Sequence, residues 1–162
     1  MPTLRRATPA DLDTAATLFD AYRRFYGQPP DVDRARRFLA ERLAAGDTAL
    51  ILAVDPGSSP VRVHPAGQAA AGAGLGFTHL FPSFTSVGTA PVVILNDLFV
   101  APEARGQGIG AALLAAAEAH ARAVGAVRLV LQTATDNAAA QRLYERAGWT
   151  PDRAFVTFEK AV

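Results

Sequence analysis

The sequence predicts an α/β fold in which helices cover a mixed sheet. Three observations favour this class. Apolar residues recur at helical spacing in some segments, other segments have the length and composition of strands, and the two kinds alternate along the chain. The expected order is one strand, two helices, three strands, one helix, one strand, one helix and a last strand. Such an order is typical of a sheet with helices on its faces.

The N-terminal third is expected to form a strand, two helices and a second strand. Residues 3–7 (TLRRA) have the length of a short strand. Thr8 is a favourable cap for the helix that follows, with Pro9 at the first helical position. The second helix is expected over Val32–Ala45, directly before a glycine. Residues 48–55 (TALILAVD) form a short apolar run, which predicts a buried strand.

The middle of the chain contains the strongest strand signal. Residues 56–67 (PGSSPVRVHPAG) are rich in Pro and Gly and are expected to be a mobile connection between strands. A glycine-weakened strand is expected over residues 69–81, and residues 82–91 (PSFTSVGTAP) indicate a turn or a long loop. Residues 92–100 (VVILNDLFV) predict a central strand.

The C-terminal third is expected to alternate helices and strands. A helix is predicted over Gly108–Val124, with Gly125 as its C-terminal cap. Residues 127–134 (VRLVLQTA) predict a strand, and a short helix follows over Asn137–Ala147. Residues 155–160 (FVTFEK) predict the last strand.

Composition and charge exclude several classes of protein. With 162 residues, half of them hydrophobic, the chain is expected to form one domain. It has no cysteine, which excludes disulfides and thiolate metal sites. The net charge of +1 gives no electrostatic case for nucleic acid or an anionic membrane as partner. The N-terminal residues contain no apolar core of a signal peptide, and no stretch reaches the length of a membrane span, so we expect a cytoplasmic protein.

The stretch RGQGIGAALLAAA, residues 105–117, has three glycines directly before the predicted third helix. Each glycine inside a helix costs about 1 kcal/mol relative to alanine, so their position requires an explanation. A helix N-terminus offers unpaired backbone N–H groups and the positive end of the helix dipole. Glycines there let a bulky anion such as a phosphate approach the backbone, and Arg105 can add a charge-assisted contact. The alternative is a glycine-rich turn that only caps a packed helix.

Two other phosphate-loop patterns fit this stretch poorly. A nucleotide P-loop requires Lys and then Ser or Thr after its last glycine, where this chain has Ala111 and Ala112. A dinucleotide fingerprint is matched formally by Gly106, Gly108 and Ala111. However, the residues APEAR separate these glycines from their strand, and Gln132 stands near the position of the required acidic residue.

Together with the strand before it, the stretch resembles the acetyl-CoA signature of the GCN5-related N-acetyltransferases. In that family an apolar strand ends in V-x-P-x-x-R, and Arg/Gln-x-x-Gly-x-Gly/Ala opens the next helix; Arg105, Gly108 and Gly110 occupy the defining positions. Residues 135–149 (TDNAAAQRLYERAGW) resemble the second signature of the family. The two signatures have the family's order and spacing, with one strand between them.

The resemblance implies a fold and a co-substrate. The fold is a single N-acetyltransferase domain over residues 1–162, with a twisted, mixed, mostly antiparallel sheet of about six to seven strands and about four helices. The co-substrate is acetyl-CoA, whose pyrophosphate is expected on the backbone amides of residues 106–111. The expected cofactor contacts are Leu98, Phe99, Val100, Arg105, Gly106, Gln107, Gly108, Ile109, Gly110, Ala111 and Asn137.

The resemblance also assigns candidate catalytic residues. Tyr144 stands where many family members carry the general acid that protonates the thiolate of coenzyme A; the alternative is a packing tyrosine. The nearest branch acetylates diamines, thialysine and related histone, polyamine and D-amino-acid amines, and its strand typically reads Glu-Asp. Here Asn96 replaces the glutamate, which is the candidate base, and Asp97 matches the aspartate. Asp97 is therefore expected to hold a cationic amine or act as base, or to be purely structural. Successive strand residues face opposite sides, so Asn96 and Asp97 can share a side only at a bulge.

The remaining candidates carry weaker signals. His79 lies on a predicted strand near the substrate side, but a single histidine is more often a core or surface residue, and His120 is expected to be a solvated helix residue. His64 also titrates near neutrality. The aromatic residues of AYRRFYGQPP either line the acceptor site or pack in the core. No spacing of His, Asp and Glu indicates a metal site.

These observations predict an enzyme that transfers an acetyl group to a primary amine of a small molecule. Since the chain has no cysteine to carry an acyl group, direct attack in a ternary complex is expected. The alternatives are a protein lysine or N-terminal acetyltransferase, and a non-catalytic acyl-CoA-binding module. A homodimer is expected by resemblance.

Overall fold

The computed structural model describes residues 2–56 and 74–162. Almost all of the connection expected over residues 56–67, and the first residues of the strand expected over 69–81, lie outside the described residues. The chain divides into two compact units, Met1–Gln132 and Thr133–Val162, and each is described by itself. No helix among the described residues is long and apolar enough to cross a membrane.

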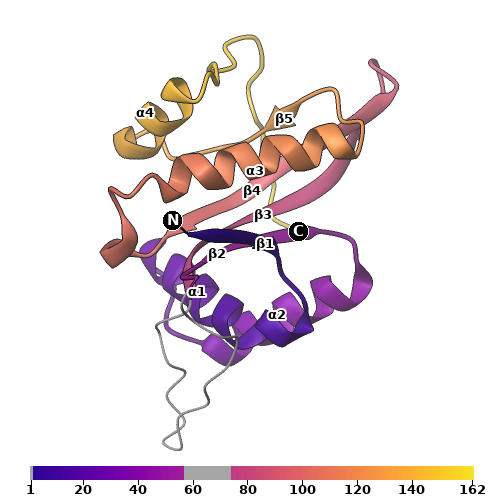
Figure 1. Ribbon diagram of the computed structural model, residues 1–162. Helices are drawn as coiled ribbons and strands as arrows, with labels where there is room; N and C mark the ends of the chain where they lie inside the picture. Colours follow the sequence, from indigo (N-terminus) through magenta and orange to yellow (C-terminus); the bar gives the residue numbers. More distant parts are fainter. Residues whose placement is uncertain (1, 57–73) are drawn as a thin grey trace, which may run out of the picture. The chain divides into compact units, whose positions relative to one another are not determined.

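The first unit is built on a five-stranded sheet in the order β1-β2-β3-β4-β5 (Figure 1). Strands β1 to β4 pair antiparallel with their neighbours, whereas β5 runs parallel to β4. The mixed, mostly antiparallel sheet is therefore confirmed. The strands cover Thr3–Arg6, Ala49–Val54, Gly74–Thr85, Ala90–Val100 and Leu129–Val130.

Helices cover both faces of this sheet. Helix α1 (Leu12–Phe25) and helix α2 (Val32–Ala45) lie on one face, and helix α3 (Ile109–Ala123) lies on the other (Figure 1). Short 3-10 turns, η1 (Pro9–Asp11) and η2 (Pro102–Ala104), precede α1 and α3. The observed bounds of α2 agree with the predicted helix, and those of α3 differ from the prediction by one residue at each end.

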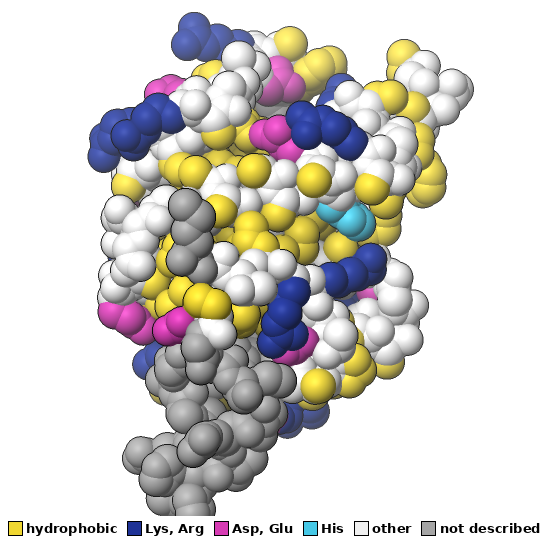
Figure 2. All heavy atoms as spheres, viewed as in Figure 1, with side chains coloured by type: hydrophobic (Ala, Val, Ile, Leu, Met, Phe, Trp, Pro, Cys, Tyr) yellow, Lys and Arg dark blue, Asp and Glu magenta, His cyan; other side chains and the backbone are white. Residues whose placement is uncertain are grey.

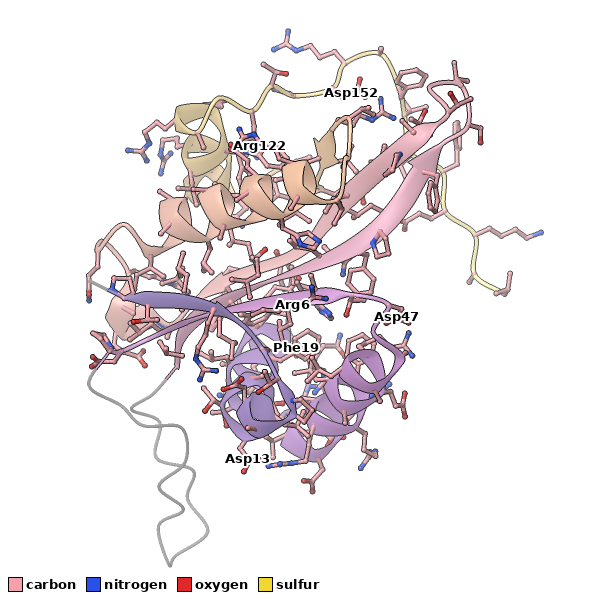
Figure 3. All side chains as sticks on the ribbon, turned by 45° about the vertical axis from the view of Figure 1, so that its right-hand side comes forward. Arg6, Asp13, Phe19, Asp47, Arg122 and Asp152 are labelled. Carbon is pink, nitrogen blue, oxygen red and sulfur yellow. The ribbon has the colours of Figure 1, made fainter. Side chains whose placement is uncertain are left out.

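The core fills the two layers between sheet and helices. Phe19 points from α1 toward the sheet (Figure 3), where its ring centroid lies 5.7 Å from that of Phe77 and 5.5 Å from that of Phe38 on α2. On the opposite face, Leu113 of α3 is fully buried. A Cβ atom at Gly76 would lie 2.5 Å from the Phe99 carbonyl oxygen and 3.4 Å from Leu113 Cδ1. This glycine is therefore required by close packing, although glycine weakens an isolated strand.

Three expected elements differ from the structure. Residues 82–91 are not a long loop: β3 continues to Thr85, β4 begins at Ala90, and four residues form the turn between them. The strand expected over 127–134 is reduced to β5. The strand expected over 155–160 is absent, so the described residues contain five strands rather than about six to seven. Local composition thus underestimates strands in one place and overestimates them in others. The reason is that a strand exists only where a neighbouring strand pairs with its backbone.

The connection between β1 and α1 is held by a buried carboxylate. Asp11, 2% exposed, accepts hydrogen bonds of 2.9 Å from both the backbone N–H and the hydroxyl of Thr8. Arg5 on β1 forms an ion pair of 2.5 Å with the same carboxylate. Burial alone opposes ionisation of Asp11, but these donors outweigh it and lower the pKa of the carboxyl. Asp11 therefore ties the first strand to the first helix.

We expect Asp11→Asn to lower the free energy of unfolding by about 2 kcal/mol at pH 7, because it removes charged hydrogen bonds from a buried site. The folded-state pKa of Asp11 is lowered, so this contribution is complete above the unfolded value of about 3.9 and disappears as the pH falls through the folded value. Urea denaturation of both proteins between pH 7 and pH 2.5 measures the difference. Glu118→Gln, which removes an exposed pair with Arg122, is the control and is expected to cost less than about 0.5 kcal/mol. A difference that stays constant down to pH 2.5 would contradict the assignment.

Candidate functional site

The glycine-rich loop before α3 has two residues in the left-handed backbone conformation. Gly106 and Gly108 have φ angles of 76° and 78°, which residues other than glycine rarely adopt. The helical hydrogen bonds begin with the bond from Ala112 N–H to the Gly108 carbonyl, 3.0 Å long. The N–H groups of the first turn, residues 109–111, are thus outside the helical pattern, and Gly108 has no side chain to cap them. These groups form a site where an anion can bind to backbone.

Arg105 connects this loop to the end of β4. Its Nε donates a 3.1 Å hydrogen bond to the Val100 carbonyl oxygen, and Gln107 Nε2 donates to the Glu103 carbonyl oxygen over 3.4 Å. Both side chains lie at the surface. Arg105 therefore holds the loop in place in addition to carrying a positive charge beside the first turn of α3.

The second half of β4 offers backbone groups on its outer edge. The pairing of β4 with β5 ends at Ile94 and Val130. Ala101 N–H bonds to the Leu75 carbonyl on the β3 side, so by alternation the backbone groups of Leu98 and Val100 point away from β3. Phe99 has the opposite orientation: its backbone faces β3. The predicted contacts of these three residues with acetyl-CoA remain predictions.

A bulge in β4 brings Asn96 and Asp97 together. His79 of β3 pairs with Asp97, but the next residue, Leu80, pairs with Leu95, so Asn96 is the extra residue. Asn96 is exposed, whereas Asp97 is buried. The Asn96 amide nitrogen lies 3.3 Å from both carboxylate oxygens of Asp97. Successive side chains can share a side of the strand only at a bulge, and the bulge is present.

Asp97 lies beside two other buried polar side chains, an arrangement that the sequence did not indicate. Its Oδ2 lies 3.4 Å from Nδ1 of His79, and Nε2 of His79 lies 2.9 Å from the hydroxyl oxygen of Thr48. Thr48 directly precedes β2, so three separate segments supply the three side chains. No local pattern could have singled out Thr48, since only the pairing of β2, β3 and β4 brings it beside His79.

An aromatic chain extends from β4 to the end of α1. The ring centroid of Tyr22 lies 6.2 Å from that of Phe99 and 5.1 Å from that of Tyr26. Phe25 and Tyr26 are about half exposed. Core packing and a role as acceptor wall were the alternatives for these residues. Tyr22 contacts the core ring of Phe77, whereas Phe25 and Tyr26 reach the surface.

The second unit contains the other two predicted site residues. Asn137 caps α4 (Ala138–Arg146), and its Oδ1 accepts a 3.2 Å hydrogen bond from Ala140 N–H. Tyr144 lies on α4, and its ring centroid is 6.2 Å from that of Trp149. Asn137 is thus the N-cap of α4, a role that asparagine often has. The roles of Asn137 and Tyr144 toward a cofactor remain predictions.

The other histidines give no further site. His64 lies outside the described residues. His120 on α3 is half-buried rather than fully solvated, and its pKa is lowered by burial and by the positive charge of Arg6. Across the described ranges, no group of three or more His, Asp and Glu residues is arranged to hold a metal ion. On the face shown in Figure 2, Lys and Arg side chains are interspersed with Asp and Glu rather than gathered into one basic patch.

Comparisons with known proteins identify the family. The sequence model of the acetyltransferase (GNAT) family matches residues 16–149. An uncharacterized N-acetyltransferase of Bacillus subtilis, YhfO, is 38% identical over 155 residues, which cover 96% of this chain and 94% of that protein. An aminoglycoside N(6')-acetyltransferase type 1 of Stenotrophomonas maltophilia is 30% identical over 97% of this chain and 92% of its own. The crystal structure of a probable acetyltransferase superposes with a TM-score of 0.85 at 35% identity, covering 99% of this chain and 97% of that chain.

The chain therefore belongs to the GNAT family of acetyltransferases, and it is an N-acetyltransferase.

Proposed function

We propose that this enzyme transfers the acetyl group of acetyl-CoA to a primary amine of a small molecule, by direct attack within a ternary complex. The observation that carries the proposal is the bulge at Asn96. It turns the carboxylate of Asp97 toward the α1 and α2 face, while Leu98 and Val100 present backbone groups on the outer edge of β4. One strand thus offers a carboxylate for an amine and backbone groups for a thioester within four residues.

The donor side of the proposed site is made of backbone. The first-turn N–H groups of α3, with the macrodipole of a 15-residue helix behind them, would bind the pyrophosphate of acetyl-CoA. Arg105 would add charge, and the backbone groups of β4 would bind the pantetheine arm. We assign the cofactor contacts to Leu98, Phe99, Val100, Asn137 and residues 105–111.

The chemistry requires a neutral amine, a stabilised oxyanion and a protonated leaving group. In the proposed reaction the amine nitrogen forms a C–N bond as the C–S bond of the thioester breaks. Asp97 holds the cationic amine and accepts its proton, and Tyr144 gives a proton to the departing thiolate. A tyrosine, with an ordinary pKa of about 10, is a proton donor at neutral pH. Without cysteine, the chain cannot form a thioester intermediate of its own.

A small cationic amine is the acceptor class that we favour. The buried carboxylate of Asp97 is suited to an ammonium group, and the relative from Stenotrophomonas is named for acetylation of an aminoglycoside amine. We also propose that this chain resembles the diamine and thialysine branch of the family in the class of amine that it accepts. The alternatives are a protein lysine or N-terminus and a non-catalytic acyl-CoA-binding module. A homodimer and a cytoplasmic location also belong to this proposal.

The deciding experiment measures release of coenzyme A from acetyl-CoA against a panel of amines. The panel contains polyamines, lysine and its analogues, L- and D-amino acids, aminoglycosides and short peptides. Preference for one small amine supports the proposal, and preference for peptides supports the protein acetyltransferase. Acetyl-CoA in the same wells should raise the melting temperature by mass action. Stabilisation without turnover of any amine supports the binding module, and no stabilisation contradicts the proposed cofactor site.

We expect Gly108→Ala to weaken acetyl-CoA binding by about tenfold or more, because it disturbs the loop that presents the first turn of α3. Gly46→Ala is a matched control, since Gly46 also has a positive φ, 63°, and at both positions a Cβ would meet nothing within 4 Å. Both variants should therefore lose a similar 1–2 kcal/mol, roughly the cost of a left-handed residue other than glycine. Calorimetric titration with acetyl-CoA distinguishes them. Equal affinities for the two variants would contradict the role of the loop.

We expect Tyr144→Phe to lower kcat by roughly 10²-fold with little change in acetyl-CoA affinity, because only the proton donor is removed. Steady-state kinetics with the preferred amine and the acetyl-CoA-dependent shift in melting temperature measure the two effects separately. Unchanged turnover in Tyr144→Phe would show that this tyrosine only packs against Trp149.

A further inference from the structure

Three buried polar side chains form a continuous chain across β2, β3 and β4. Thr48, His79 and Asp97 are exposed by 7%, 0% and 6%. The Thr48 hydroxyl lies 2.9 Å from Nε2 of His79, and Nδ1 of His79 lies 3.4 Å from Oδ2 of Asp97. The proposed reaction uses Asp97 but gives no role to His79 or Thr48.

For a neutral His79 beside an ionised Asp97, the hydrogen-bonding capacity of these groups allows one consistent assignment of protons. An ionised carboxylate can only accept, so a neutral His79 must carry its proton on Nδ1 to make a favourable contact with Asp97. Nε2 is then an acceptor, and the hydroxyl of Thr48 must be the donor. The opposite tautomer would direct two acceptors at each other in a fully buried position, which is costly.

The surroundings of His79 keep its ring in this orientation. Its ring centroid lies 4.6 Å from that of Phe81, 6.2 Å from that of Phe38 and 6.4 Å from that of Phe19. Aromatic side chains offer no strong alternative acceptor, so the polar contacts of the ring are those along the sheet. Nδ1 of His79 is buried and makes no hydrogen bond among the described residues, and Oδ2 of Asp97, 3.4 Å away, is the acceptor that faces it. Such contacts commonly tighten when substrate binds.

We propose that Thr48 and His79 are positioning residues that orient the carboxylate of Asp97 for the acceptor amine. This inference rests on the proposed function, in which Asp97 binds a cationic amine. The ionised carboxylate of Asp97 requires the Nδ1–H tautomer of a neutral His79, and the hydroxyl of Thr48 then holds the ring by donating to Nε2. Nδ1–H faces Oδ2 of Asp97 without contributing a charge. In this arrangement Oδ1 of Asp97, which also lies 3.3 Å from the amide nitrogen of Asn96, is the oxygen left for the amine.

The first test determines the tautomer of His79 and needs no substrate. Long-range ¹H–¹⁵N NMR distinguishes the two neutral tautomers, and the chain has three histidines, so His79→Phe assigns the signal. We expect the proton on Nδ1 in the wild-type protein, and in Thr48→Val a changed ¹⁵N shift of Nε2, which has lost its hydrogen-bond donor. A wild-type ring protonated on Nε2 overturns the proposal, as does an Nε2 resonance that is the same in Thr48→Val as in the wild-type protein.

The second test separates a positioning role from a structural one by kinetics. Thr48→Val keeps the shape of the side chain and removes the hydroxyl, whereas Thr48→Ser retains the hydroxyl. For Thr48→Val we expect kcat/KM for the amine to fall about tenfold, the equivalent of one hydrogen bond, with KM for acetyl-CoA unchanged. Thr48→Ser should stay within about twofold of wild type. A loss of the same size in both variants, or in neither, refutes the positioning role.

Two controls keep the outcomes distinct. Thr17→Val removes a hydroxyl that donates to the Asp13 carbonyl within α1, and it should leave kinetics unchanged. If the wild-type enzyme acetylates no amine, the proposed function fails, and the NMR result still decides whether the chain from Thr48 to Asp97 exists. If the wild-type enzyme is active and Thr48→Val matches it, only the positioning role fails. Wild-type NMR remains decisive if Thr48→Val does not fold.

Discussion

The antiparallel pairing of β3 with β4, interrupted at Asn96, is the constraint on which the rest of the site depends. Before the bulge, the backbone groups of β4 alternate in one phase, and after it they alternate in the other. Asp97 can therefore pair with His79 and face α1 and α2, while Leu98 and Val100 turn their backbone groups to the outer edge. An unbulged strand would move one of these sets to the wrong side.

Burial makes this arrangement demanding. Thr48, Thr78, His79 and Asp97 are all nearly inaccessible to solvent, and each needs a partner to offset the loss of water. Thr78 donates to the backbone carbonyl of Asp97 over 3.0 Å, and the hydroxyl of Thr48 lies 2.9 Å from Nε2 of His79. Nδ1 of His79 lies 3.4 Å from the carboxylate of Asp97. The polar groups thus join the three central strands from within, where a core of aliphatic side chains alone would leave the register less specified. The same contacts orient the one carboxylate that the proposed chemistry uses.

On the opposite face of the sheet, the constraint is that backbone atoms lie close to neighbouring atoms. Gly76 permits the packing of β3 beside Phe99 and Leu113, and Gly108 adopts a left-handed conformation at the start of α3. In both places a side chain is absent because backbone must be accessible or must lie near other atoms. On the α1 and α2 face the rings of Phe19, Phe38 and Phe77 pack together instead.

The sequence by itself determined the fold class, the position of each helix, the glycine loop and the residues that carry the family resemblance. These are local properties: helical spacing, capping at Thr8 and Asn137, and glycine where the backbone turns are all encoded within a few residues. It overestimated the length of the turn within residues 82–91 and of the strand over 127–134, and its strand over 155–160 was wrong. Whether such segments become strands depends on a distant neighbour that pairs with them. The sequence also named Asp97 and, on a weaker signal, His79 as candidates, but it did not indicate that the two lie together or that Thr48 joins them. Only the tertiary structure decided that Thr48 and His79 lie beside Asp97, since hydrogen bonds between strands join residues that are far apart along the chain.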